Sequence, residues 1–106
     1  MNETITILCT CPDEASAARL ARGLLEERHA ACVNVLPAIR SLYTWEGEIR
    51  DEQEALMIIK TTHSHFFVIE HWLREHHPYD VPELVALQAE HVSEPYLRWL
   101  RASVSE

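Results

Sequence analysis

Residues 4–14 read Thr-Ile-Thr-Ile-Leu-Cys-Thr-Cys-Pro-Asp-Glu, and this stretch contains the change of pattern that decides the fold. Up to Cys11 the side chains alternate with a period of two and many are β-branched, which predicts a strand over 4–11. Pro12 suits the first turn of a helix, and the two acids after it complement the positive end of a helix dipole. Leu20 and Leu24 then recur at helical spacing. We therefore expect a helix over about residues 12–28.

The rest of the chain continues this alternation of strands and helices, with one hairpin inserted. The remaining predicted elements are strands at 31–43, 55–62 and 83–90, and helices at 64–76 and from 93 onwards. Pro37 indicates an edge strand or a bulge, because proline cannot donate to a ladder. Gly47 lies in the predicted turn of the hairpin, and Pro78 ends the helix before it. Ser93 is expected to be the N-cap of the last helix.

The predicted order is β-α-β-β-α-β with an added C-terminal helix, which is the split βαβ arrangement of an α+β, ferredoxin-like fold. We expect residues 1–106 to form a single domain, because a chain of this length buries enough surface to fold alone. In this arrangement the helices cover one face of the sheet only. The strands nevertheless carry apolar residues on both faces, with Leu8, Leu84 and Ala86 expected opposite Val85 and Leu87. The open apolar face predicts an oligomer.

Charge and cysteine content exclude several classes of protein. The formal net charge is −8, and the nine Lys and Arg residues form no basic run, which argues against binding to nucleic acid or acidic membranes. Cys9, Cys11 and Cys32 are an odd number, and the first two are too close in one strand to pair comfortably. Residues 1–4 lack a signal-peptide pattern and no apolar run spans a bilayer. We expect a reduced, cytoplasmic protein without disulfides or contact with a membrane.

Five motifs together make the chain recognisable. They are LCTCPDE at 8–14, AACVN at 30–34, SLYTWEG at 41–47, KT at 60–61 and HHPYDVPEL at 76–84. Over nearly its whole length the chain resembles the divalent-cation tolerance family, CutA. This resemblance implies a ferredoxin-like subunit in a tight homotrimer, similar in plan to the PII signalling proteins, with long hairpins that interlock between subunits.

The same resemblance implies a metal site. The family's proposed ligands fall on Cys9, in its Cys-Thr-x-Pro motif, and on the paired histidines His76 and His77. A thiolate and imidazoles suit copper, zinc or another soft to borderline cation, and suit Mg²⁺ poorly. Cys11 departs from the family pattern, in which a small residue is expected here. It shares a strand face with Cys9, so it is either an additional ligand or a packing residue.

Each candidate residue also has a structural interpretation. Cys9 alone is typical of a small buried residue in a central strand. Adjacent helical residues point about 100° apart, so His76 and His77 bind one ion together only if the helix ends there, and one of them can instead satisfy the last helix carbonyls. Cys32 is assigned to packing in the core. The aromatic residues Tyr43, Trp45 and Trp72 are assigned to contacts at an interface. The acids Asp51, Glu52 and Glu54 are assigned to a solvated arm of the hairpin.

The sequence contains none of the motifs of common enzymes, with no GxSxG elbow, HExxH helix, Walker loop or GxGxxG turn. The leading hypothesis is therefore a non-enzymatic, cytoplasmic, trimeric protein that binds copper or another divalent cation and contributes to metal tolerance. The alternative is a PII-like trimeric signalling or scaffold protein that binds a small molecule or a protein partner at clefts between subunits.

Overall fold

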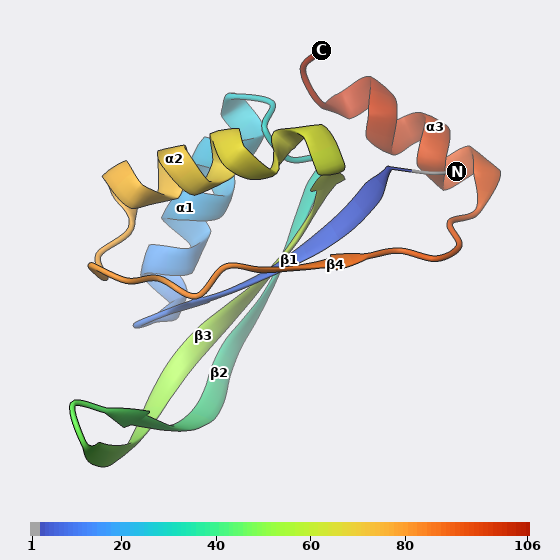
Figure 1. Ribbon diagram of the computed structural model, residues 1–106. Coiled ribbons are helices and arrows are strands. Elements are labelled where there is room, and N and C mark those ends of the chain that lie inside the picture. The colour runs from blue at the N-terminus through green and yellow to red at the C-terminus, as the bar shows by residue number, and fades with distance from the viewer. Residues whose placement is uncertain (1–2) are drawn as a thin grey trace.

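The computed structural model describes residues 3–106 as one four-stranded antiparallel sheet with helices packed on one face. The elements in chain order are β1 (Thr4–Cys11), α1 (Glu14–Glu26), β2 (Cys32–Trp45), β3 (Glu48–Thr62), the short 3₁₀ helix η1 (His63–His65), α2 (Phe66–His76), β4 (Val85–Gln88) and α3 (Glu94–Ser103). The strand order is β2-β3-β1-β4. Figure 1 shows α1 and α2 on the same side of the sheet, with the β2–β3 hairpin projecting beyond them. The predicted α+β, ferredoxin-like fold is confirmed.

The ends of several elements differ from the prediction. Helix α1 begins at Glu14, because Asp13 is the N-cap: its carboxylate accepts a hydrogen bond from the Ser16 amide at 2.7 Å. Ser93 does take the N-cap position of α3, but its side chain makes no capping hydrogen bond. Strand β4 has only the four residues Val85–Gln88. A stretch of three residues, His63–His65, winds as a 3₁₀ helix before α2 begins.

The β2–β3 hairpin is longer than predicted, because its polar arm is paired as strand. β3 starts at Glu48, and Arg40 of β2 donates two hydrogen bonds, at 2.7 and 2.9 Å, to the carboxylate of Asp51. Glu46 and Gly47 both have positive φ angles, 51° and 81°, which suits a two-residue turn between strands. Around Pro37 the register with β3 shifts, and β2 is an edge strand, so the predicted edge position and bulge are both present.

The core lies between the sheet and the helices α1 and α2. Alternate residues of β1 are buried on this side, and the last two of them are Cys9 and Cys11, whose side chains are fully buried. Leu20 and Leu24 of α1 and Ile69 of α2 cover them. The apolar face that the period of two gives β1 therefore packs against the apolar faces that the 3.6-residue period gives the helices.

The opposite face of the sheet carries apolar side chains that no helix covers. Leu8 of β1 lies directly between Ile58 of β3 and Val85 of β4, and Leu87 is 52% exposed. The prediction that Leu8 and Val85 lie on opposite faces was wrong, because the two residues are paired across β1 and β4. Which residues share a face depends on the register between the two strands, and the sequence of each strand alone does not fix this register. The prediction of an open apolar face is confirmed.

Helix α3 is attached at the end of the molecule where the chain turns from α1 into β2. Arg28 lies in this turn with a positive φ of 58°, and its guanidinium donates to the backbone carbonyls of Ala102, Ser103 and Val104. The Ser105 amide donates back to the Arg28 carbonyl at 2.9 Å. One arginine thus satisfies the carbonyls at the C-terminus of α3, which would otherwise have no partner within the helix.

Trp72, predicted among the interface aromatics, packs within the chain between α2 and α1. Its indole packs against the core and over Gly23 of α1, so closely that a Cβ on residue 23 would lie 2.5 Å from the ring. Gly23 is thus required by the contact between α1 and α2, although glycine lowers helix propensity by about 1 kcal/mol relative to alanine.

The Gly23→Ala variant tests this contact. Alanine should raise helix propensity, but the clash with Trp72 outweighs that gain, so we expect a net loss of about 1–2 kcal/mol in the free energy of unfolding. Denaturant unfolding measures the difference. The double variant Gly23→Ala/Trp72→Leu removes the clash, so alanine should no longer destabilise the protein relative to Trp72→Leu alone. A Gly23→Ala variant as stable as wild type would contradict the interpretation.

Candidate metal centre

Two cysteines and one histidine meet at the end of β1. Among the described residues, Cys9, Cys11 and His77 form a group in which one ligand atom of each residue lies within 4.8 Å of the others. The two thiols come from consecutive inward-facing positions of β1, and His77 follows directly after α2. All three residues are buried. The local sequence explains the position of His77, because Pro78 forces the preceding residue out of the helical conformation, and His77 is extended with a ψ of 139°.

Both ring nitrogens of His77 have partners, and these define its tautomer. The backbone amide of Tyr79 donates to Nδ1 at 3.0 Å, so Nδ1 is an acceptor and carries no proton. The proton of the neutral ring is therefore on Nε2, which donates to the Thr10 carbonyl at 2.9 Å and lies 3.8 Å from the sulfur of Cys11. His77 thus joins the chain after α2 to the end of β1.

The two thiols differ in their readiness to ionise. The pKa of Cys11 falls to about 6, because its thiolate accepts a hydrogen bond from Cys9 and another from His77, although burial acts in the opposite direction. The pKa of Cys9 is raised, by its hydrogen bond to Cys11 and by burial. The two thiols therefore titrate as a coupled pair, in which the surroundings favour the thiolate of Cys11 over that of Cys9.

Carboxylates and a tyrosine lie beside this group. Glu54 of β3 is buried, with 6% of its surface exposed, and its Oε2 accepts a hydrogen bond of 2.6 Å from the hydroxyl of Tyr79. Burial, and then Glu54, raise the pKa of Tyr79. The pKa of Glu83 is raised by burial and by the charge of Glu54. The predicted solvated position of Glu54 was wrong, because Tyr79 closes over it.

His76 lies outside the group of three. It is exposed at the end of α2, where its Nδ1 lies 2.7 Å from the Trp72 carbonyl and its ring stacks on the indole of Trp72 at 4.0 Å between centroids.

Cys32 is only partly buried and is not in the core, so its predicted packing role was wrong. As the first residue of β2 it lies on the open face of the sheet, opposite Lys60.

The donor set fits a soft or borderline cation. Two sulfurs and one imidazole nitrogen within 4.8 Å of one another are the ligand types of copper and zinc sites, and hard oxygen donors do not belong to the group. The period of two on β1 places both thiols together, whereas sequence reasoning missed the contact of Tyr79 with His77. The only sequence signal for that contact is the position of Tyr79, two residues beyond the histidine.

Comparisons with known proteins show the family of the chain. Residues 5–103 match the family described as CutA1 divalent ion tolerance protein. The chain belongs to the CutA1 family. A divalent-cation tolerance protein CutA from Citrobacter koseri is 48% identical over 102 residues, which are 96% of this chain and 89% of the relative.

Solved CutA1 structures share the fold over almost the full chain. The divalent cation tolerance protein from Thermus thermophilus aligns with a TM-score of 0.93 at 41% identity, covering 96% of this chain and 99% of that one. CutA1 from Oryza sativa aligns with a TM-score of 0.94 at 39% identity, covering 97% and 94%. A CutA from Archaeoglobus fulgidus, described as periplasmic, aligns with a TM-score of 0.93 at 33% identity, covering 96% and 99%. Among the described residues of the present chain, no helix is long and apolar enough to cross a membrane.

The pKa of Cys11 can be measured by following thiolate absorbance against pH in a Cys32→Ser variant. We expect a midpoint near pH 6. Because the folded pKa lies below the ordinary thiol value, the thiolate stabilises the fold at high pH, and this stabilisation is lost as the pH falls through about 6. Cys9→Ala removes the main donor and should move the midpoint upwards, while Cys11→Ser should remove the transition. A midpoint at the ordinary thiol value in the parent variant would refute the assignment.

Proposed function

We propose that this CutA1-family chain binds copper, or zinc as a second candidate, and contributes to metal tolerance by holding the ion. The observation that carries the proposal is the buried group of Cys9, Cys11 and His77, with its ligand atoms within 4.8 Å of one another. Cys11 adds a second sulfur to the ligands that the family resemblance implies. His76 is assigned a secondary role, because it lies outside this group and stacks on Trp72.

Electrostatics favour a cation at this position. The pKa of Cys11 is lowered, mainly by its contacts with Cys9 and His77, and Glu54 lies close enough to influence both thiols, while Glu83 influences Cys9. No arginine or lysine ion pair with Glu54 or Glu83 occurs among the described residues. An electronegative, largely water-excluded pocket stabilises a positive ion more strongly than an exposed cluster does.

Binding of an ion requires changes in the protonation of the chain's own groups. Cys9 must release its proton to become a ligand, and the Nε2 atom of His77 must release the proton that it now donates to Thr10. If a neutral His77 binds the ion through Nε2, its proton must lie on Nδ1. The hydrogen on Nδ1 would then face the amide hydrogen of Tyr79, and the present hydrogen bond between these two groups would be lost. Occupancy is therefore coupled to the backbone of residues 77–79.

We further propose that the protein acts as a homotrimer in the cytoplasm and that its activity is binding rather than catalysis. Support for assembly comes from the apolar sheet face formed by Leu8, Ile58, Val85 and Leu87, which is too large to leave in water on a small domain. The edge strands β2 and β4 also offer backbone groups for pairing with another copy. The cytoplasmic location is supported by three free cysteines, since disulfides form in oxidising compartments.

The ligand set is tested by titrating the reduced, metal-free protein with Cu(I) and with Zn(II), using a competing chelator of known affinity. Cys9→Ser, Cys11→Ser and His77→Ala should each weaken binding by about a hundredfold or more, because even the loss of an outer-shell partner costs about 10–100-fold. His76→Ala and Cys32→Ser are matched controls and should stay within about threefold of wild type.

Two results of that titration would count against the proposal. Equal affinity in all five variants would contradict metal binding at this group and favour the PII-like signalling or scaffold alternative. A large loss in His76→Ala with none in Cys11→Ser would keep a metal function but replace the proposed ligands. Circular dichroism of each variant shows whether a loss of binding arises from unfolding.

Assembly is tested by the mass in solution. Light scattering should give three chains per particle, and the particle should persist below micromolar concentration because the covered face is apolar. Leu87→Glu should yield a smaller species that is still folded. Leu87 is half-exposed within one chain, so a charge there does not destabilise the fold, but it would be buried against a partner chain and should prevent assembly. Glu90→Gln, at an exposed position beyond β4, is the control. A wild-type monomer at these concentrations would disprove the assembly.

A further inference from the structure

A second charged site lies at the end of the molecule opposite the hairpin turn, where α3 meets the turn between α1 and β2 (Figure 1). A hollow of about 550 Å³ opens there. Its lining residues are Arg28, Arg98, Arg101, Ala102, Val104 and Glu106. Three of the nine Lys and Arg residues of a chain with a net charge of −8 therefore face one small space. This concentration of positive charge is unconnected with the thiol group on β1.

Arg28 is held in a fixed position at this hollow. Its Nε and Nη2 atoms donate to three carbonyls at the end of α3, over distances of 2.9 to 3.3 Å. The Nη1 group makes no hydrogen bond to any residue in the described part of the chain and still has two N–H donors. A guanidinium that is already ordered loses little side-chain entropy when it binds a ligand.

The other two arginines extend from the same side of α3, since residues 98 and 101 are three apart on a helix. Arg98 lies 3.4 Å from Glu94, but both side chains are largely exposed, so this pair is weak. Arg101 forms no ion pair within residues 3–106. Glu106 lines the hollow, yet its carboxylate pairs with none of the three arginines. Three arginines and one glutamate line the hollow, so its lining side chains carry a net positive charge.

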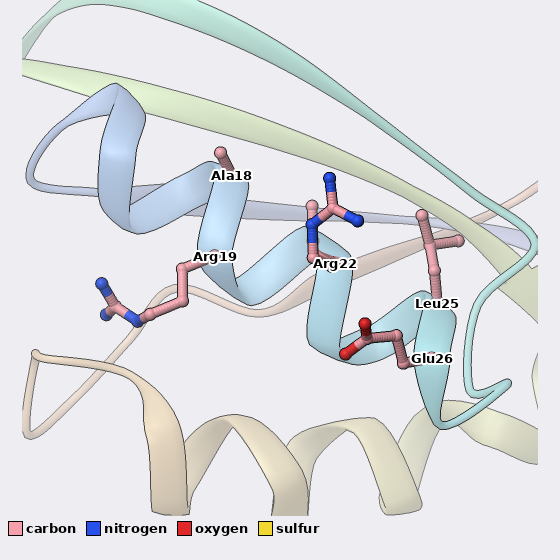
Figure 2. Close-up of a pocket in the computed structure, with 6 residues that line it drawn as sticks. Ala18, Arg19, Arg22, Leu25 and Glu26 are labelled. Atoms are coloured by element: carbon pink, nitrogen blue, oxygen red, sulfur yellow. The ribbon is translucent and has the colours of Figure 1, made fainter.

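The larger hollow of the molecule lacks this convergence. It measures about 750 Å³ and lies along α1. Figure 2 shows its two arginines pointing apart: Arg22 lies on the side of the β2–β3 hairpin, and Arg19 extends away from it. Ala18, Ala21 and Leu25 form the rest of its wall together with Glu26. Of these two hollows, the one at α3 brings the guanidinium groups to one space.

We propose that the hollow formed by Arg28, Arg98 and Arg101 binds a small phosphate-bearing anion. Guanidinium groups match the oxygens of a phosphate with paired hydrogen bonds, and a phosphate with close to two negative charges can contact more than one arginine. At physiological ionic strength charges interact over roughly 8 Å, so this local cluster outweighs the acidic remainder of the surface. The site is independent of the proposed metal function.

Pyrophosphate is the probe for this site, added to metal-free protein and followed by isothermal titration calorimetry. Arg101→Gln should raise the dissociation constant by about tenfold, and Arg98→Gln/Arg101→Gln should abolish measurable binding, because each removes charge-assisted hydrogen bonds. Arg101→Lys keeps the charge but loses the forked geometry, and should bind less tightly than wild type. Arg28 is left unchanged, since its substitution would also release α3.

Arg74→Gln is the matched control. Arg74 is an exposed arginine in an i,i+4 pair with Glu70 on α2, so its loss changes the net charge equally without touching the hollow. This variant should bind pyrophosphate as wild type does, as should Cys9→Ser, whose change lies in the metal group. Absence of binding to wild type, or an equal loss in Arg74→Gln and Arg101→Gln, would overturn the proposal. Thermal melting confirms that each variant is folded.

Discussion

The pairing of β1 between β3 and β4 is the constraint on which the rest of the structure depends. Residues of β1 form antiparallel ladders on both sides, so each side chain is committed to one face of the sheet. One face receives α1 and α2 and becomes the core. The other face carries Leu8 in the middle of an apolar strip, and this strip is covered only if another apolar surface packs against it. A slip of one residue would exchange the two sets and expose both thiols.

The position of the thiols shows how a sheet can support polar chemistry in an apolar core. Cys9 and Cys11 occupy the last two inward positions of β1, next to the segment that follows α2. His77, Tyr79 and Glu54 then satisfy one another's polar atoms through hydrogen bonds. A buried polar group without such partners would destabilise the fold by about 1–3 kcal/mol, so these bonds are needed whether or not an ion is held.

Local pattern predicted the fold and placed both thiols on one face of β1, the family resemblance implied Cys9 as a ligand, and the prediction failed where the outcome depends on distant contacts. The period of two places Cys9 and Cys11 on one face whatever the partners of β1 are. Pro78 also predicts correctly that α2 ends at His76, but which of the two histidines contacts the thiols depends on how the chain after α2 packs against β1. Glu54 belongs to an acidic stretch that reads as solvated, and its burial comes from Tyr79, which is remote in sequence. The register of β4 against β1 is equally a property of the assembled sheet.

The ladders of β1 also bear on how the protein is made. Leu8 pairs with Ile58 and Val85, so β1 is joined by residues from the middle and the far end of the chain. Contacts between such distant segments form late, because they require large loops to close first. Until those loops close, Cys9 and Cys11 lack the cover that the helical layer gives them in the folded chain. The central position of β1 therefore makes the burial of both thiols depend on the closure of the whole sheet.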